Sequence, residues 1–303
     1  MTYAAVTPPA TIGFVGLGNM GYPMALNLAK AGFKLAVADL NQDAVKKFCA
    51  EAEGAVAPTT LAELGQRSRV VITMLPDGKA VRKVLLGADG IVGGLQRDAL
   101  LIDMSSSSPV DTRELARELK ARQIDLIDAP VSGGVVKAVS GGLAIMAGGE
   151  PDAIAAVEGV FAPLGKVFRT GASGSGHAMK AINNFLSATT LAITSEALIA
   201  GTKFGLDPNT MVDIINASTG RSNSSEHKFP TFVLPRKFNS GFFLGLMAKD
   251  LRFAKALSDA VDAPNIFVNA ISKLYDEAEQ EFGPLADNIE IHRYLELLDR
   301  HPH

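Results

Sequence analysis

Cysteine is almost absent from this chain, because its 303 residues contain only Cys49. A single cysteine cannot form an internal disulfide, so the chain suits a reducing compartment. A catalytic thiol needs a histidine or another cationic neighbour to ionise. The sequence around Cys49 supplies only lysines and no histidine. We therefore expect a half-buried thiol on a helix.

The chain also lacks an excess of charge of either sign. It has 29 Lys+Arg against 32 Asp+Glu, a formal net charge of −3, and no sustained basic run. This balance excludes a nucleic-acid binder that works by neutralising phosphates. Hydrophobic residues make up 47% and charged residues 20%, which excludes a long disordered protein and is typical of globular ones.

Long hydrophobic runs are missing as well. The most apolar stretch, 185–200, is short and contains Glu196 and several serine and threonine residues. A spanning helix needs about 20 predominantly apolar residues, so we expect a buried core helix here and no membrane span. Residues 1–10 show neither the basic nor the apolar part of a secretory signal. We therefore expect a soluble, cytoplasmic protein.

Short apolar runs alternate with helical stretches in the first part of the chain. The runs lie at 12–16, 35–40, 70–76, 99–104, 125–130, 143–149 and 166–171. Most are continuously apolar, as expected for strands covered on both faces. Ser108, Pro109 and Asp111 predict the capped start of one helix. The alternation predicts a Rossmann-type, doubly wound, mainly parallel sheet in an α/β fold.

Strand signals stop after Gly171. The remaining sequence predicts helices, separated by glycines and prolines. Their approximate bounds are 176–204, 208–218, 247–260, 264–281 and 286–299. We therefore expect two domains, an α/β domain at residues 1–172 and an all-α domain at residues 173–303.

A glycine-rich segment, Gly16-Leu17-Gly18-Asn19-Met20-Gly21, follows the first apolar run and opens a helix. Gly16 permits a tight turn, Gly18 lets the backbone approach a pyrophosphate, and Gly21 allows close helix–strand packing. The helix N-terminus offers N–H groups to the phosphates. This context predicts a dinucleotide site.

An acid, Asp39, follows the second apolar run. Its carboxylate can accept from both ribose hydroxyls and would repel a 2′-phosphate. No arginine follows to receive such a phosphate, so the sequence favours NAD over NADP. FAD fits the glycine pattern too, but the remaining motifs of the chain do not favour it.

A second candidate segment is DAPVSGG at 128–134, which follows an apolar run. Ser132, Gly133 and Gly134 therefore lie at the carboxyl end of a strand, where α/β proteins bind ligands. A serine hydroxyl next to glycine N–H groups forms a small nest for an anion. The alternative is an ordinary strand-to-helix turn.

A third candidate lies on the long apolar helix. Lys180, Asn183 and Asn184 are spaced i, i+3 and i+4, so they share one face. A lysine on such a helix suits acid–base chemistry, because desolvation lowers its pKa. Asn183 is more simply a packing amide, and we leave it out of the predicted site.

Four motifs in this order resemble the β-hydroxyacid dehydrogenase family, which includes 3-hydroxyisobutyrate, tartronate semialdehyde (2-hydroxy-3-oxopropionate) and threonate dehydrogenases. They are GFVGLGNMG (13–21), DAPVSGG (128–134), GSGHAMKAINN (174–184) and Lys249-Asp250. The resemblance spans about residues 12–298. It implies a Rossmann domain, a long interdomain helix, a helical C-terminal domain and a homo-dimer or homo-tetramer.

The resemblance also implies roles for individual residues. Lys180 would be the catalytic residue, Asn184 a substrate ligand, and the 132–134 segment the site of the substrate carboxylate. Asp250 would help to hold the site, although Lys249-Asp250 also reads as an exposed ion pair. The positions implied to line the cofactor are Leu75, Pro76, Ser106 and Lys249.

The expected function is that of an oxidoreductase. It would transfer a hydride between NAD and a small 3-hydroxy acid or its semialdehyde, with Lys180 as general acid/base. The five histidines show no paired ligand spacing, so we expect no metal. Two alternatives remain open: an imine reductase, which usually has Asp or Tyr in place of Lys180, and a non-catalytic NAD-binding scaffold.

The substrate itself is left open by the sequence. The segment 218–245 is predicted as a loop that closes on the substrate. It carries four basic residues, Arg221, Lys228, Arg236 and Lys237. These either form solvated surface or receive a second acidic group of the substrate.

Overall fold

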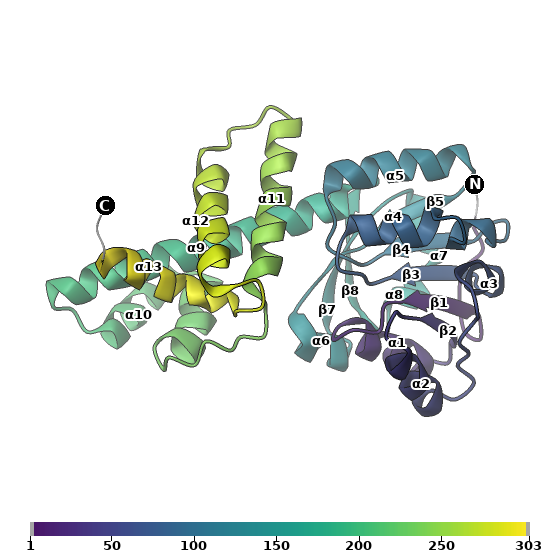
Figure 1. The fold of residues 1–303 in the computed structure, drawn as a ribbon, viewed down its shortest axis with the longest axis horizontal. Coiled ribbons are helices and arrows are strands. Elements are labelled where there is room, and N and C mark those ends of the chain that lie inside the picture. The colour runs from purple at the N-terminus through teal and green to yellow at the C-terminus, as the bar shows by residue number, and fades with distance from the viewer. Residues whose placement is uncertain (1–2, 301–303) are drawn as a thin grey trace. The chain divides into compact units, whose positions relative to one another are not determined.

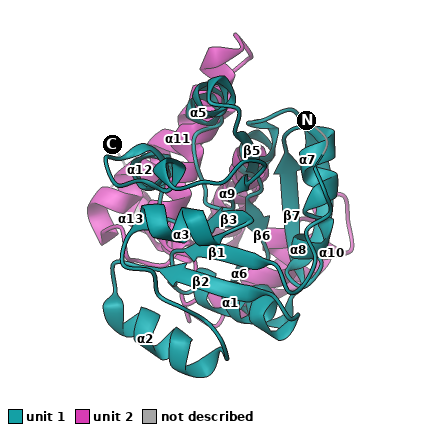
Figure 2. Cartoon of the chain, turned by 90° about the vertical axis from the view of Figure 1, so that its right-hand side faces the viewer, with its two compact units in different colours: residues 1–180 teal, residues 181–303 magenta. Residues whose placement is uncertain are grey.

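The structure is a computed structural model that describes residues 3–300 (Figure 1). Its contacts divide the chain into two compact units, residues 1–180 and 181–303 (Figure 2). The division falls inside helix α9 (Ser175–Phe204). The boundary expected between residues 172 and 173 lies just before this helix and stays a prediction.

The first unit contains one eight-stranded sheet with the order β2-β1-β3-β4-β5-β7-β6, in which β8 pairs with β7. The strands are β1 (Thr11–Val15), β2 (Lys34–Ala38), β3 (Val70–Thr73), β4 (Leu100–Asp103), β5 (Asp125–Asp128), β6 (Val131–Ser132), β7 (Leu143–Gly148) and β8 (Gly165–Gly171). From β2 to β5 every pair is parallel. The expectation of a mainly parallel, Rossmann-type sheet is confirmed.

Two details of the sheet differ from the sequence prediction. Strand β7 runs antiparallel to β5 and β6, and Ser132 lies in β6 itself rather than directly after β5. A two-residue strand is too short to show a hydropathy period. Pairing direction depends on how the connecting segments cross the sheet, which an apolar run does not reveal.

Helices cover both faces of this sheet (Figure 1). They are α1 (Gly21–Lys30), α2 (Gln42–Glu51), α3 (Leu61–Arg67), α4 (Gly78–Leu86), α5 (Pro109–Ala121), α6 (Gly134–Ser140), α7 (Pro151–Ala156) and α8 (Glu158–Phe161). The expected cap of α5 is confirmed, because Ser108 Oγ accepts from Asp111 N at 3.3 Å. Cys49 is half-buried on α2, as expected, and burial raises its pKa.

The core of the first unit forms two apolar clusters. Ile72 lies in one and its neighbour Val71 in the other, because alternate side chains of a strand point to opposite faces. Both residues are fully buried, like the rest of β3. This two-sided burial explains why the strands read as continuous apolar runs.

The second unit is helical, as predicted. After α9 come α10 (Pro208–Asn216), α11 (Leu244–Ala260), α12 (Ile266–Phe282) and α13 (Ile291–Arg300). Their shared core contains Leu191 of α9, Leu251 of α11, Tyr275 of α12 and Ile291 of α13. The amphipathic faces of these helices are therefore buried against one another.

The prediction of a loop at 218–245 is wrong in part. Residues Ser224–Val233 form a π-helical segment, η2, that buries Phe229 and Val233. Its polar first half and the internal Pro230 suggested a loop, since proline cannot donate the bond that an α-helix requires. Tertiary burial of the aromatic and aliphatic side chains overrides that local signal.

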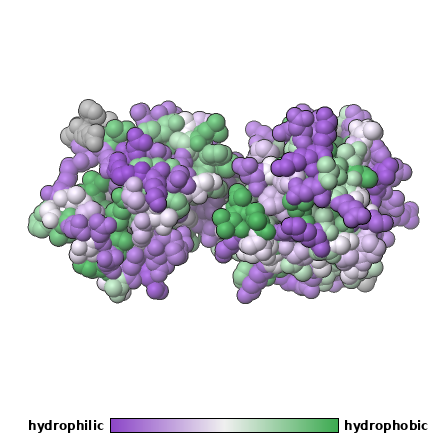
Figure 3. All heavy atoms as spheres, turned by 90° about the horizontal axis from the view of Figure 1, so that it is seen from below, coloured by the Kyte–Doolittle hydropathy of each residue, from purple (hydrophilic) through white to green (hydrophobic). Residues whose placement is uncertain are grey.

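Helix α9 is long and apolar enough, by length and composition, to cross a membrane, a test that core helices of soluble proteins also pass. Only 33% of its most apolar stretch is buried. The expectation of a buried core helix at 185–200 therefore holds for Ala188 and Leu191 but not for Leu186 and Ile193, which are exposed. Hydrophobic residues also reach the surface elsewhere in both units (Figure 3).

Candidate cofactor and active site

The glycine-rich loop joins β1 to α1. Gly16 has a φ of +103°, and a Cβ on it would lie 2.2 Å from the carbonyl oxygen of Met74. A Cβ on Gly21 would lie 1.9 Å from the carbonyl oxygen of Gly16. By contrast, nothing lies within 4 Å of the Cβ position of Gly18, which is exposed. The turn itself requires Gly16 and Gly21, whereas Gly18 leaves open space for a ligand.

The start of α1 fits a phosphate. No side chain caps this helix end, so its N–H groups and partial positive charge face the loop. A cleft of about 530 Å³ opens beside it, and Leu17, Gly18 and Asn19 contribute to its lining. Bare N–H donors next to open space are what a pyrophosphate needs.

Asp39 connects the loop to the end of β2. Its Oδ2 accepts from Leu17 N at 2.6 Å, and its Oδ1 accepts from Asn41 N at 2.6 Å. A carboxylate has about four lone-pair positions, so acceptor capacity remains for ribose hydroxyls. Asp39 therefore holds the loop in place and presents a negative charge beside it.

The other residues predicted to line the cofactor lie at the same edge of the sheet. Leu75 and Pro76 follow β3, and Ser106 follows β4. Because β1, β3 and β4 are parallel neighbours, their carboxyl ends meet there. Leu75 N donates to Ser105 Oγ at 2.9 Å, which ties the two strand ends together.

The predicted anion nest lies at the junction of β6 and α6. Gly133 and Gly134 are exposed and have φ values of +132° and +67°. Successive N–H groups in such a turn form an anion-binding concavity, with the half-buried Ser132 beside it. Lys180 Nζ donates to the carbonyl oxygen of Val131 at 2.9 Å. The structure thus brings Lys180 next to the nest.

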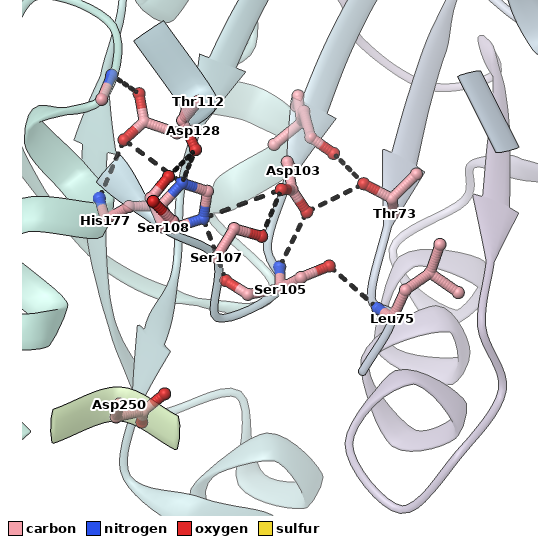
Figure 4. Close-up of polar contacts among 12 residues, drawn as sticks. Thr73, Leu75, Asp103, Ser105, Ser107, Ser108, Thr112, Asp128, His177 and Asp250 are labelled. Atoms are coloured by element: carbon pink, nitrogen blue, oxygen red, sulfur yellow. Dashed lines mark hydrogen bonds and ion pairs between the residues drawn. The ribbon is translucent and has the colours of Figure 1, made fainter. Parts of the chain in front are cut away.

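A buried network that the sequence analysis missed lies where β4 and β5 end and α9 begins (Figure 4). Asp103 and Asp128 are register partners at the ends of β4 and β5. The buried ring of His177 lies beside both, with Nε2 3.7 Å from Asp103 Oδ2 and Nδ1 3.8 Å from Asp128 Oδ2. The sequence held a signal, since two successive apolar runs contain an aspartate near the same end.

The hydrogen bonds of His177 orient its ring. Nε2 lies 3.1 Å from the carbonyl oxygen of Ser105, so Nε2 donates. Nδ1 lies 2.8 Å from Thr112 Oγ1, whose one proton is directed to the carbonyl oxygen of Ser108 at 2.8 Å. These two contacts fix the ring between Asp103 and Asp128.

Asp128 also caps the start of α9. Its Oδ1 accepts from Gly174 N at 2.6 Å and its Oδ2 from His177 N at 2.8 Å. Burial raises the pKa of Asp128, although the His177 charge and these N–H bonds act in the opposite direction. A carboxylate at a helix N-terminus also interacts favourably with the helix dipole. Lys180, one turn further along, is thereby held relative to the edge of the sheet.

In the second unit, Asp250 contacts the two remaining predicted residues, Asn184 and Lys249. Its Oδ2 accepts from Asn184 Nδ2 at 2.6 Å, and its Oδ1 lies 3.9 Å from Lys249 Nζ. Asp250 is buried rather than exposed, so the surface ion-pair interpretation is wrong for it. Asn183 Nδ2 donates to Asn184 Oδ1 at 3.1 Å, which fits the packing role expected for Asn183.

Within residues 3–300, no group of three or more histidine, cysteine, aspartate or glutamate side chains could hold a metal ion. His301 and His303 lie outside the described residues. The expectation that the protein uses no metal stays a prediction.

This combination of fold and loop defines a dinucleotide-binding protein of the Rossmann class. Residues 11–179 match the family described as the NAD-binding domain of 6-phosphogluconate dehydrogenase. Residues 174–295 match the family described as NAD-binding of NADP-dependent 3-hydroxyisobutyrate dehydrogenase.

Individual relatives agree with these matches. Human mitochondrial 3-hydroxyisobutyrate dehydrogenase is 37% identical over 89% of this chain and 82% of its own. The 2-(hydroxymethyl)glutarate dehydrogenase of Eubacterium barkeri is 38% identical over 80% of each chain. The 3-hydroxyisobutyrate dehydrogenase of Mycobacterium tuberculosis, solved with L-serine, has a TM-score of 0.87 and 31% identity, covering 94% of this chain and 99% of that one.

The chain therefore belongs to the β-hydroxyacid dehydrogenase family, as its motifs predicted. An imine reductase from Myxococcus stipitatus is more distant, with 18% identity and a TM-score of 0.62. That likeness shows a shared fold alone.

The glycines of the loop allow a matched test. Gly18→Ala should fold normally and bind NADH about tenfold more weakly, because its methyl group occupies space that a pyrophosphate needs. Gly21→Ala should lose about 3 kcal/mol of unfolding free energy, the upper end of overpacking costs, because its methyl group meets backbone. Urea unfolding and NADH fluorescence titration measure the two effects. Unchanged NADH affinity in Gly18→Ala would contradict this assignment.

The His177 network predicts a strong effect on stability. His177→Ala opens a cavity beside two buried aspartates and removes the partner of the Ser105 carbonyl oxygen, so we expect a loss of about 3 kcal/mol of unfolding free energy. An exposed histidine of the second unit, His227, provides the control, since His227→Ala should change the unfolding free energy by less than about 0.5 kcal/mol. Equal unfolding free energies for the two variants, measured in urea, would show that the network does not stabilise the fold.

Proposed function

We propose that this protein transfers a hydride between NAD and a small 3-hydroxy acid, or its semialdehyde, with Lys180 as the general acid/base. Compounds of this class include 3-hydroxyisobutyrate and 2-(hydroxymethyl)glutarate, which appear in the names of relatives. The observation that carries the proposal is the position of Lys180 Nζ, 2.9 Å from the carbonyl oxygen that precedes the Ser132–Gly134 nest.

The nest and the lysine suit the two ends of such a substrate. Ser132, Gly133 and Gly134 hold the carboxylate with hydroxyl and N–H donors. Lys180 takes the proton of the substrate hydroxyl in oxidation and returns it in reduction, a role for which a positioned amine is suited. Asn184 orients the substrate while Asp250 holds the Asn184 amide.

The cofactor side of the site uses residues at the carboxyl edge of the sheet. The glycine loop and the start of α1 hold the pyrophosphate, and Asp39 accepts from the ribose. Leu75, Pro76 and Ser106 would line the bound cofactor, and Lys249 would contact it near the nicotinamide. When bound, the nicotinamide ring supplies or accepts the hydride. The protein contributes orientation, because the reacting carbon must be fixed against the ring.

The preference for NAD rests on Asp39. Its carboxylate is fixed by two backbone N–H bonds, so it cannot swing away from a 2′-phosphate. The residues after it, Leu40, Asn41 and Gln42, offer no cation. Repulsion of a 2′-phosphate at this position would therefore go uncompensated.

A homo-oligomer is the assembly that α9 supports. Ile182, Leu186 and Ile193 are 41%, 56% and 53% exposed. Their spacing places them in one stripe, on the side of α9 opposite Lys180. An apolar stripe of this kind is suited to a second copy of the chain, in a dimer or a tetramer. A cytoplasmic location stays a prediction, and several relatives are mitochondrial by name.

Replacing Lys180 tests the chemistry. Lys180→Ala should lower kcat by about 10²–10⁴, the usual contribution of a general acid/base, while the Kd for NADH changes little. Lys203, an exposed lysine further along α9, provides the control, and Lys203→Ala should keep full turnover. NADH formation with 3-hydroxyisobutyrate measures kcat. Turnover close to that of the unmodified protein in Lys180→Ala would overturn the catalytic role.

The choice of cofactor can be measured without any variant. At saturating hydroxy acid, kcat/KM for NAD should exceed that for NADP by at least about tenfold, the effect of one uncompensated charge. The difference should lie mainly in KM and shrink at high ionic strength, because salt screens exposed charges. Equal kcat/KM values for the two cofactors would refute the preference for NAD.

A further inference from the structure

The segment 218–245 was left open by the sequence as either solvated surface or a substrate contact. In the structure, the four basic residues of this segment differ in burial and in their partners. Arg236 forms two bonds to Glu296, at 2.6 and 2.9 Å. Arg221 lies 3.6 Å from Glu226, and both side chains are largely exposed. These two arginines are surface groups paired with carboxylates.

Lys228 differs from Lys237, in the same segment, in the burial of its side chain. Lys237 is exposed, whereas Lys228 is half-buried on the π-helical segment η2. Lys228 Nζ donates to Ser187 Oγ of α9 at 3.0 Å. An ammonium has three donors, and a neutral serine hydroxyl does not balance its charge.

The negative charge that acts on Lys228 comes from Asp287, and that carboxylate is already engaged. Its oxygens accept from Ser240 Oγ at 2.7 Å, from Gly241 N at 2.8 Å and from Ile289 N at 3.0 Å. Asp287 exerts a field on Lys228, but within residues 3–300 the two form no ion pair. Lys228 thus keeps the capacity to bind an anion.

Ser187 places this ammonium on the face of α9 that carries Lys180 and Asn184, which we call the reacting face. It lies three residues after Asn184 and seven after Lys180, so all three point to the same side of the helix. At about 1.5 Å of rise per residue, Ser187 is about 4.5 Å beyond Asn184 along the axis and about 10 Å beyond Lys180.

We propose that Lys228 receives a second anionic group of the substrate, so that the preferred substrate is a 3-hydroxy acid with a further carboxylate at its distal end. This inference rests on the function proposed above and adds the substrate class to it. The first carboxylate and the hydroxyl lie at the Lys180 end of the face. The distal carboxylate extends along α9 to Lys228 and displaces or shares the hydroxyl of Ser187.

Keeping a cation in this position has a cost, which supports a function for it. Burial lowers the pKa of Lys228 to about 8, and the field of Asp287 offsets this only in part. The unfolded chain therefore binds more protons between pH 8 and about 10.5, so the cost is fully present below pH 8 and disappears across that window. A group that served only the fold would be better replaced by an apolar side chain.

The test compares a diacid with a monoacid on two lysine variants. Lys228→Met should lower kcat/KM for 2-(hydroxymethyl)glutarate by about ten- to a hundredfold, through KM, because a charge-assisted hydrogen bond is lost. Turnover of 3-hydroxyisobutyrate should change by less than about threefold, since it has no distal group. Lys237→Met, in the same segment, should leave both substrates unaffected.

The unmodified protein provides an independent readout. Its KM for the diacid should rise above about pH 8, as Lys228 loses its proton, while the KM for the monoacid should not follow this rise. Ser187, on α9, cannot produce the difference because a serine hydroxyl does not titrate in this range. Deprotonation of Lys180 would affect both substrates alike.

Two results would overturn the inference while leaving the hydroxyacid dehydrogenase function intact. One is an unmodified protein that turns over the monoacid as efficiently as the diacid. The other is an equal loss of both activities in Lys228→Met. Turnover of neither substrate by the unmodified protein would instead overturn the proposed function, and this inference with it.

Discussion

The position of Lys180 depends on one interaction, the capping of helix α9 by the carboxylate of Asp128. Asp128 ends a central strand of the sheet, and it accepts N–H groups from both Gly174 and His177. The ring of His177 then connects the same helix end to Asp103 on the neighbouring strand. A helix held at its first turn can rotate or slide only a little along its axis. The position of Lys180 therefore follows from this contact.

The residues of the cofactor loop serve two different purposes that a glycine pattern alone does not separate. Backbone packing requires Gly16 and Gly21, which would be needed even in a protein without a ligand. Gly18 meets no protein atom, so its lack of a side chain matters only to something that binds there. Asp39 braces the loop backbone through its two N–H contacts and also places a negative charge beside the loop.

Local signals predicted most of the fold and much of the candidate site. Strands buried on both faces, long helices and the strand–loop–helix context of Gly16–Gly21 each leave a pattern within a few residues. The contact of His177 with Asp103 and Asp128 joins three distant segments, so local patterns place the two aspartates near strand ends but do not reveal their contact with the histidine. Segment η2 was missed because buried contacts outweigh its polar composition and Pro230. Lys228 looked like its basic neighbours until the structure showed which of them turns inward.

The reacting face of α9 sets fixed distances between the side chains that it carries. Successive side chains on one face of a helix mark distances of about 5 Å, one turn each. Under the proposed function, proton transfer takes place at Lys180, near the capped end of α9, and the contacts beyond Asn184 determine which substrate length fits. In that proposal, the chemistry and the substrate length depend on different turns of the same helix. Substitutions around Ser187 could therefore change the substrate accepted in evolution without disturbing the catalytic end.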